Sequence, residues 1–221
     1  MFDAVIFDWD GTLGDTREVI VASFQQTLKE IKCSVSDEYI SRRIGIGAAD
    51  TFRDILRSAK RPFDEEIIQR LVARKSAFEI EFANQVKLFP GVTVLLDALF
   101  GKIKMGLASM NNYSVINCLV KAKGLTRYFD VTVTAESISH SKPNPEIFLK
   151  IASLLGAKPC ECVVVEDSVF GVKAAWSADM HCVAVTTGVY SASELERERP
   201  DLIVRTLEDK RVLAFILQQL T

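Results

Sequence analysis

Six short runs of apolar, β-rich residues are the clearest pattern in this chain. They cover residues 4–7, 104–108, 131–134, 162–165, 182–186 and 202–204. Several of these runs are apolar without alternation, which is expected of strands that are covered on both faces. Segments with helical spacing separate most of the runs. Strands that alternate with helices predict an α/β fold with a mostly parallel sheet.

Helix boundaries can be placed at several positions. Asn144 is expected to cap a helix whose first position is Pro145, and Gly156 is expected to end it. Apolar residues between them recur at spacings of three and four, as in a helix with one buried face. A second helix is expected to start at Ser168 or Val169, and Gly171 inside it suggests close backbone contact.

About seventy residues after the first run contain no convincing strand. Their spacing is helical, with short breaks at residues 32–37, 44–48 and 60–64. A strong turn signal follows at Leu88-Phe89-Pro90-Gly91. The alternation of strands and helices resumes after it. We therefore interpret residues 15–85 as an inserted helical cap domain. Residues 1–14 and 86–221 then form the α/β core.

Composition excludes several classes of protein. The 221 residues are 48% hydrophobic and 25% charged, and the net charge of −2 offers no basic excess for nucleic acid or an anionic membrane. No run of about 18 uncharged apolar residues is present, so no membrane span is expected. Five scattered cysteines do not form a disulfide framework, which favours a reducing, cytoplasmic compartment. We expect a monomer, and we interpret the charged run at residues 194–199 as a solvated helix face.

Polar residues follow each of the first four predicted strands. In an open parallel sheet, ligands bind beyond the carboxyl ends of the strands, so these residues should share one site. They are Asp8, Asp10, Gly11 and Thr12; Ser109, Met110 and Asn111; Ser141 and Lys142; and Glu166, Asp167 and Ser168.

These side chains suit phosphoryl transfer. Asp8, Glu166 and Asp167 could supply the carboxylates that Mg²⁺ prefers, usually alongside a substrate phosphate. Lys142 could balance the charge of that phosphate. Hydroxyl groups such as that of Thr12, and backbone N–H groups near Gly11, could donate hydrogen bonds to phosphate oxygens. A carboxylate can also attack phosphorus itself and form an aspartyl-phosphate.

Four motifs in order resemble those of the haloacid dehalogenase-like hydrolase superfamily. They are FDWDGTL at residues 7–13, LASMNN at 107–112, SKPNPEIF at 141–148 and VVVEDSVFGVKAA at 163–175. The helical insertion resembles the cap that this superfamily places after its first motif. The resemblance covers essentially the whole chain, and it implies a Rossmann-like parallel sheet core with an inserted all-α cap.

The resemblance assigns a role to each matching position. Asp8 would be the nucleophile. Asp10 would protonate the leaving group and then activate water, while its backbone carbonyl binds Mg²⁺. Thr12 and Ser109 would hold the phosphate, and Lys142 would stabilise both the phosphate and the Asp8 carboxylate.

The remaining matches complete the implied site. Asp167 would bind Mg²⁺ directly, with Glu166 as a direct or water-mediated partner. Met110 and Asn111 would complete the phosphate-binding set. The substrate would be a small phosphorylated metabolite, and the reaction would be phosphatase chemistry.

A few residues bear on which reaction of this superfamily the chain would catalyse. Asp10 argues against carbon dehalogenases and phosphonoacetaldehyde hydrolases, which lack a second aspartate there. β-Phosphoglucomutase stays open as an alternative, although its cap histidine and arginine correspond to Ile20 and Ala48 here. A non-catalytic phospho-aspartate switch or binding protein is the other alternative. A switch needs neither the large insertion nor Asp10.

The cap sequence around residue 45 is expected to select the substrate. Ile44-Gly45-Ile46-Gly47 resembles a loop that reaches over the active site in relatives, although a plain turn between helices would also fit. Arg42, Arg43 and Arg53 are candidates for a second anionic group on the substrate.

Overall fold

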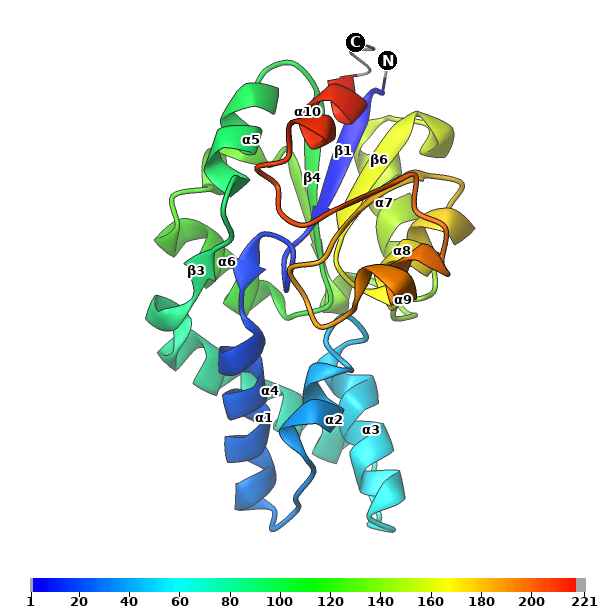
Figure 1. Ribbon diagram of the computed structural model, residues 1–221. Coiled ribbons are helices and arrows are strands. Elements are labelled where there is room, and N and C mark those ends of the chain that lie inside the picture. The colour runs from blue at the N-terminus through cyan, green and yellow to red at the C-terminus, as the bar shows by residue number, and fades with distance from the viewer. Residues whose placement is uncertain (1, 218–221) are drawn as a thin grey trace.

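A six-stranded sheet forms the centre of the computed structural model, which describes residues 2–217 (Figure 1). The strand order is β5-β4-β1-β6-β7-β8, and every neighbouring pair is parallel. The strands are β1 Ala4–Asp8, β4 Lys104–Ser109, β5 Val131–Thr134, β6 Cys162–Glu166, β7 His181–Val185 and β8 Leu202–Val204. Each lies within one residue of a predicted run, so the predicted parallel α/β sheet is confirmed.

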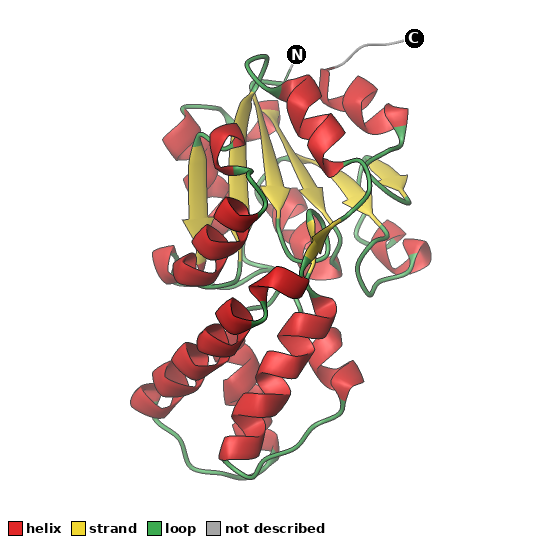
Figure 2. Cartoon of the chain, turned by 90° about the vertical axis from the view of Figure 1, so that its left-hand side faces the viewer, coloured by secondary structure: helices red, strands yellow, loops and turns green. Residues whose placement is uncertain are grey.

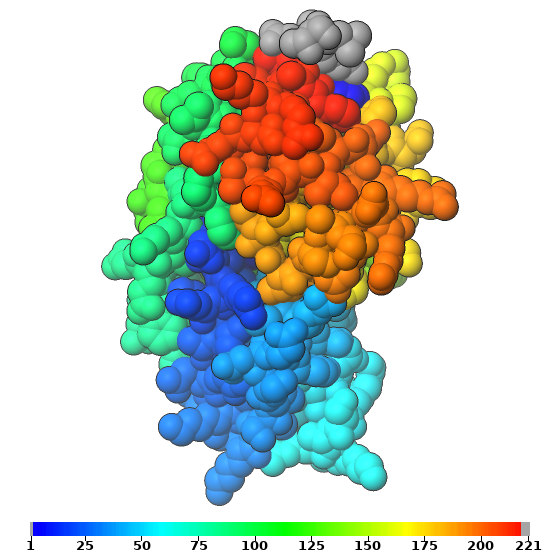
Figure 3. Space-filling model, in the orientation of Figure 1, coloured from blue at the N-terminus to red at the C-terminus, as the bar shows by residue number. Residues whose placement is uncertain are grey.

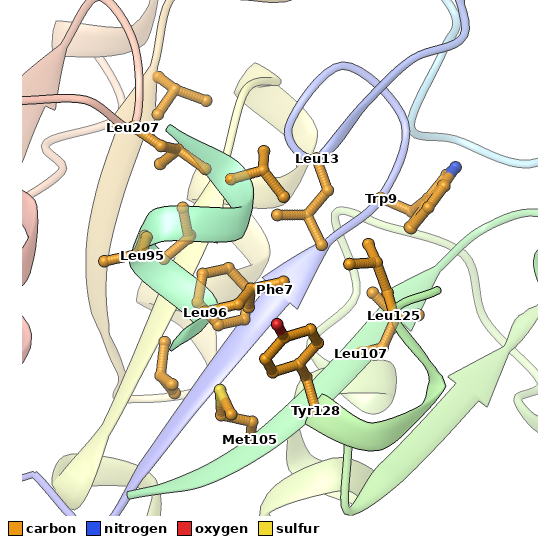
Figure 4. Close-up of a cluster of buried hydrophobic side chains, with 14 of the residues drawn as sticks. Phe7, Trp9, Leu13, Leu95, Leu96, Met105, Leu107, Leu125, Tyr128 and Leu207 are labelled. Carbon is orange, nitrogen blue, oxygen red and sulfur yellow. The ribbon is translucent and has the colours of Figure 1, made fainter. Parts of the chain in front are cut away.

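Helices cover both faces of this sheet. On one face lie α5 Val92–Leu99, α6 Tyr113–Ala122 and α10 Lys210–Leu217, and on the other lie α7 Glu146–Leu155, α8 Val169–Ser177 and α9 Ala192–Glu196. Along β1, Val5 and Phe7 belong to the first apolar cluster, whereas Ala4 and Ile6 belong to the second. Figure 4 shows Phe7 among side chains of α5 and β4. Burial on both faces is why the strands are apolar without alternation.

The predicted helix boundaries agree closely with the structure. The Asn144 side chain accepts a hydrogen bond at the start of α7, although Pro145 stands one residue before the helix rather than at its first position. Gly156 ends α7 in the left-handed conformation, with φ of 64°. Ser168 caps α8 by accepting a hydrogen bond of 3.0 Å from the Gly171 N–H group.

Four helices lie together beyond the carboxyl ends of the strands (Figures 1 and 2). They are α1 Arg17–Glu30, α2 Asp37–Ser41, α3 Ala48–Ser58 and α4 Glu65–Glu81, and their breaks fall within two residues of the predicted ones. Their buried side chains, such as Phe24, Phe52 and Ile68, form an apolar cluster separate from the two on the sheet. The bounds of 15–85 for a cap domain stay a prediction.

A short antiparallel pair, which the sequence pattern did not predict, lies where the chain leaves the sheet and returns to it. It joins β2 Gly14–Asp15 to β3 Lys87–Leu88, with Gly14 opposite Leu88. Strands of two residues are too short to show alternation, so periodicity alone could not detect them. The pair holds the two connections to the helices side by side.

Two further observations concern cysteines and membrane segments. All five cysteines are free thiols. Within residues 2–217, none of the helices has both the length and the apolar composition that a membrane crossing requires.

Candidate active site

The buried ammonium of Lys142 joins two carboxylates at the carboxyl end of the sheet. Its Nζ lies 2.6 Å from Asp8 Oδ1 and 2.6 Å from Glu166 Oε1. Asp8 ends β1, Glu166 ends the adjacent β6, and Lys142 arrives from the loop that follows β5. Burial alone would lower the pKa of Lys142, but the charges of Asp8 and Glu166 outweigh it and raise that pKa. Lys142 therefore stays protonated.

Asp8, Glu166 and Asp167 form one acidic cluster. One carboxylate oxygen from each residue lies within 4.8 Å of the other two. Burial raises the pKa of Asp8 and of Asp167 well above the ordinary range, and Lys142 only partly opposes these shifts. One lysine cannot neutralise three carboxylates, and a set of carboxylate oxygens suits a hard divalent cation such as Mg²⁺.

The three carboxylates differ in how many hydrogen bonds they already accept. Glu166 Oε2 accepts from the N–H groups of Asp167 and Ser168, both at 2.8 Å, and from the Ser168 hydroxyl at 3.0 Å. Its other oxygen holds Lys142. In contrast, one oxygen of Asp8 and one of Asp167 accept no hydrogen bond from residues 2–217. Glu166 thus anchors its turn, while Asp8 and Asp167 keep a free oxygen each.

The Asp10 carboxylate has hydrogen-bond partners of its own. Thr16 donates a hydrogen bond of 2.9 Å to its Oδ1, and Ser109 donates one of 3.2 Å to its Oδ2. Burial raises the pKa of Asp10, and the positive charge of Lys75 is the largest opposing influence. The two aspartates of FDWDGTL therefore have different partners, and Thr16 is a neighbour that the motif did not reveal.

Thr12 and Ser109, predicted to hold phosphate, are completely buried beside the carboxylates. The Thr12 hydroxyl donates to Asp167 Oδ1 at 3.2 Å, and Ser109 donates to Asp10. The N–H groups of Gly11 and Thr12 close the local turn, on the carbonyls of Gly14 and Trp9 respectively. The hydroxyls thus line the site, but these two N–H groups are already bonded within the turn.

The predicted loop at residues 44–47 lies over the site. Gly45 is placed against Ser168, and Gly47 against Met110, with φ angles of 101° and 115° that favour glycine. A cavity of about 30 Å³ beneath the loop is lined by Asp10, Ile20, Phe24, Arg43, Ile44, Gly45, Gly47, Ala48, Thr51, Lys75, Met110 and Asn111. A larger cleft of about 390 Å³ shares Gly47, Ala48 and Met110 with it and opens between α3 and α4 and the loops after β4 and β5.

The cap residues predicted to contact substrate have different positions. Arg43 lines the small cavity and pairs with Asp54, and Arg53 lines the larger cleft. Ile46 and Arg42 line neither space. Substrate contact by these residues stays a prediction for Arg43 and Arg53, whereas the Arg42 guanidinium is held elsewhere on the core.

Lys75 and Glu79 of α4 are site residues that the sequence reasoning missed. Both are buried, and their charged groups lie 2.7 Å apart. Lys75 Nζ lies 3.3 Å from Asn111 Oδ1, and Asn111 Nδ2 donates a 3.0 Å hydrogen bond to Glu79. The sequence did indicate that Lys75 and Glu79 are buried, because both residues continue the helical spacing of the buried Ile68 and Val72. Charged residues on the apolar face of a helix mark groups that packing buries.

The fold and the site define a class of protein: a parallel α/β sheet with a helical insertion and one acidic site that is built around a buried lysine. The chain belongs to the haloacid dehalogenase-like hydrolase family, whose model matches residues 5–185. The family predicted from the four motifs is therefore confirmed.

Relatives of known name agree with this assignment. The chain is 32% identical over 213 residues to "Probable phosphatase IndB" of Dickeya dadantii, covering 93% of this chain and 90% of the relative. It is 29% identical over 207 residues to "Pyrophosphatase PpaX" of Oceanobacillus iheyensis, covering 93% of each. These names support a hydrolase of phosphate esters.

Solved structures share the fold along the full chain. A hydrolase from Pseudomonas syringae superposes with a TM-score of 0.87 at 26% identity, covering 99% of both chains. β-Phosphoglucomutase from Clostridium difficile superposes with a TM-score of 0.86 at 25% identity, covering 99% of this chain and 98% of that one. Hydrolase and mutase thus share this architecture, and the choice between them depends on the chemistry of the site.

Proposed function

We propose that this protein is a Mg²⁺-dependent phosphatase that hydrolyses a small phosphate monoester through an aspartyl-phosphate on Asp8. The observation that carries the proposal is the Asp8–Lys142 contact of 2.6 Å beside Glu166 and Asp167, with Asp10 held separately. This arrangement supports one carboxylate as the nucleophile and a second one as the proton carrier.

Asp8 acts as the nucleophile. Lys142 holds one of its oxygens, and the other is free to form a bond to phosphorus as the bond to the leaving oxygen breaks. The Lys142 ammonium remains charged throughout and offsets the negative charge of the phosphoryl group. Its burial strengthens that interaction, because little water screens it.

Asp10 supplies and recovers the proton. Burial raises its pKa, which lets it carry a proton closer to neutral pH than an exposed aspartate does. It protonates the leaving oxygen in the first step. In the second step it takes a proton from the water that cleaves the aspartyl-phosphate, so that the proton returns to Asp10 and Asp8 is regenerated.

Mg²⁺ fits the acidic cluster. Asp167 has a free oxygen to offer, the Asp8 oxygen that accepts from Lys142 has a further lone pair, and the Asp10 backbone carbonyl is a third candidate. Glu166 is suited to hold the ion through water, because both of its oxygens are already bonded. When bound, the cation neutralises carboxylate and phosphate charge, so that an anionic nucleophile and an anionic substrate can meet.

The space above the carboxylates supports a small substrate. The cavity of about 30 Å³ beneath the loop at residues 44–47 suits a small leaving group, and a larger one would extend into the adjoining cleft. Lys75 and Arg43 line the small cavity. Sugar phosphates, phosphoglycolate, nucleoside or flavin monophosphates and pyrophosphate are the candidates, and the PpaX relative supports including pyrophosphate.

A β-phosphoglucomutase reaction is the second candidate, because a protein of that name superposes on the whole chain. Ile20 and Ala48 argue against it, since both line the small cavity where the mutase would use polar cap residues.

The experiment is a hydrolysis assay with 4-nitrophenyl phosphate, followed by a panel of phosphorylated metabolites and pyrophosphate. We expect release of inorganic phosphate with Mg²⁺ and none with EDTA. No turnover by the wild type, or unchanged turnover by Asp8→Asn, would overturn the phosphatase. Interconversion of hexose phosphates with little phosphate release would identify the mutase instead.

A further inference from the structure

Arg42, at the end of α2, connects the helical insertion to residues 189–194 of the core. Its Nη2 lies 2.6 Å from Glu194 Oε1, and its Nη1 donates a hydrogen bond of 3.4 Å to the Val189 carbonyl. Its guanidinium carbon lies 4.3 Å from the centre of the Tyr190 ring. The Tyr190 hydroxyl in turn donates a 2.6 Å hydrogen bond to the Arg42 carbonyl. We call these four residues the Arg42 clasp.

The core side of the clasp is held rigidly. Tyr190 is buried, and the Phe170 ring packs edge-on against it at 6.1 Å. Glu194 completes a capping box at the start of α9, where its Oε2 accepts a 2.9 Å hydrogen bond from the Ser191 N–H group. One oxygen of Glu194 thus caps a helix while the other binds Arg42. The hydrogen bond from Arg42 lowers the pKa of Glu194 to about 2, so the pair stays charged at neutral pH.

The clasp is adjacent to the proposed active site on both sides. In the core, Thr187 lies three residues before Tyr190 and donates a 2.6 Å hydrogen bond to the carbonyl of Gly11, which directly follows Asp10. In the insertion, Arg42 lies two residues before the loop at residues 44–47. Figure 3 shows the light-blue atoms of this part of the insertion directly against the orange atoms of the core.

A second contact ties the far end of the same loop. Ser141 donates a 2.5 Å hydrogen bond to Asp50, which lies in the first turn of α3. Ser141 precedes Lys142, so this contact reaches the loop that carries the buried lysine. The segment that covers the carboxylates is therefore fastened to the core at residue 42 and at residue 50.

We propose that Arg42 is a positioning residue: through the clasp it fastens the loop at residues 44–47 over the carboxylates, and it does not bind substrate. The proposal rests on the phosphatase function proposed above. A partly exposed ion pair is weak by itself, but here it acts together with a buried hydroxyl and an aromatic ring. Without the clasp, the covered state that excludes water becomes less populated, and the apparent affinity for substrate falls with it.

The test uses Arg42→Ala, Glu194→Gln and the charge swap Arg42→Glu/Glu194→Arg. Glutamine is a good probe because it retains the capping box but removes the charge that Arg42 binds. With 4-nitrophenyl phosphate and Mg²⁺, we expect kcat/KM to fall about five- to tenfold in both single variants, mainly through KM, and to recover in part in the swap.

Arg74→Ala is the matched control. Arg74 also pairs with a glutamate, Glu30, at 2.7 Å and also lies over an aromatic ring, that of Phe78, at 4.2 Å. All three residues belong to the four-helix insertion, so the control removes the same kinds of contact without unfastening the insertion from the core. We expect its kcat/KM to stay within about twofold of the wild type.

Hydrogen–deuterium exchange in the free enzyme gives a readout that needs no activity. Exchange at residues 42–47 and 187–191 should rise in Arg42→Ala and Glu194→Gln, but not in Arg74→Ala. Unchanged exchange in Arg42→Ala would overturn the clasp, even in an active enzyme. A wild-type kcat/KM in Glu194→Gln together with a large loss in Arg42→Ala would make Arg42 a substrate ligand instead. Failure of the wild type to hydrolyse any phosphate ester would overturn only the phosphatase.

Discussion

At the scale of single residues, Lys142 determines how the acidic site can exist in a folded protein. An isolated buried ammonium would be strongly unfavourable, and so would three buried carboxylates without a cation. The contacts of Lys142 with Asp8 and Glu166 at 2.6 Å reduce both costs. They still leave an excess of negative charge, which a divalent cation could offset.

Replacing Lys142 should therefore affect both activity and stability. We expect Lys142→Met to lose at least about 10³-fold in kcat/KM, because phosphoryl transfer loses its fixed positive charge. Its free energy of unfolding should fall by about 3–5 kcal/mol, since buried carboxylates are left unpaired. Urea unfolding in EDTA measures the second effect. The control is Lys173→Met in the exposed position of α8, and an equal loss in both variants would contradict the role given to Lys142.

Replacing Asp8 should affect stability in the opposite direction to replacing Lys142. Asp8→Asn should lose at least about 10³-fold in kcat/KM, because the amide cannot form the phosphoryl ester. The pKa of Asp8 is raised by burial, so the native state binds a proton that the unfolded chain has already released. The stability of the wild type in EDTA should consequently fall as the pH rises from about 4 towards neutrality.

Asp8→Asn lacks this titration, so its stability relative to the wild type should improve over the same pH range. Urea unfolding at a series of pH values measures the difference. Lys173→Met, which replaces an exposed side chain and removes no carboxyl group, is the control and should show no such trend. A constant or shrinking difference between Asp8→Asn and the wild type would show that Asp8 is not destabilised by burial.

At the scale of elements, the turn from β6 into α8 shows how a helix positions a carboxylate. Glu166 ends the strand, and its Oε2 accepts the Asp167 and Ser168 N–H groups as α8 begins. Gly171, in the first turn of that helix, lies so close to the Glu166 carboxyl that a Cβ atom would overlap it. The sequence predicted a close backbone contact at Gly171, and the structure instead places a side chain, the Glu166 carboxyl, against it.

Gly171→Ala should consequently be destabilising. Alanine normally favours a helix interior by about 1 kcal/mol over glycine. Here we expect a loss of about 1–3 kcal/mol in the free energy of unfolding, because Glu166 or the helix must shift. Activity should fall as well, since Glu166 holds Lys142. Lys173→Ala in the same helix is the control, and a stabilised Gly171→Ala would contradict the overlap.

The buried face of helix α4 is apolar in one half and charged in the other. Its buried face begins with Ile68 and Val72 and ends with Lys75 and Glu79, where it meets Asn111 of the core. The apolar half packs within the insertion, while Lys75 lines the small cavity and Glu79 contacts Asn111. One helix thus contributes both to the core of the insertion and to the polar surface above the carboxylates.

At the scale of the whole molecule, the site lies between two packed bodies. The sheet supplies the carboxylates and Lys142, and the four-helix insertion covers them with the loop at residues 44–47. The chain passes between these bodies at the β2–β3 pair. The Arg42 and Asp50 contacts complete the connection. We therefore expect a cation that binds at this site to stabilise the folded protein as a whole.

Mg²⁺ should raise the midpoint of thermal unfolding. A ligand at 100 times its Kd that binds only the native state contributes about 2.7 kcal/mol. For a chain of this size that corresponds to an increase of about 5–10 °C. Differential scanning fluorimetry with and without Mg²⁺ measures it. Asp167→Asn should lose most of the increase, and an equal increase in that variant would place the ion elsewhere.

The expected monomer is a separate prediction at this scale. Light scattering coupled to size exclusion should give a mass near the 24.6 kDa of the chain. A mass of twice that value would contradict it. The expectation of a cytoplasmic, reducing compartment also stays a prediction, and cell fractionation would test it.

The sequence by itself determined the strands, the helix caps and the four strand ends that carry the chemistry. Each of these depends on neighbours close in sequence, such as apolar runs, capping residues and turn glycines. Parallel topology then brings the strand ends to one edge, so the order of the motifs was enough to group Asp8, Lys142 and Asp167 in one site.

Only the tertiary structure determined which charged residues of the helices are buried and what they contact. Lys75 and Glu79 resemble an ordinary exposed i,i+4 pair, and Glu194 lies in a run that reads as solvated. Whether such a charge contacts water, Asn111 or Arg42 depends on the packing of segments that are 32 to 152 residues apart in the sequence. The helical spacing of Lys75 and Glu79 indicates that packing covers them, but it does not identify their partner, because a distant segment supplies it.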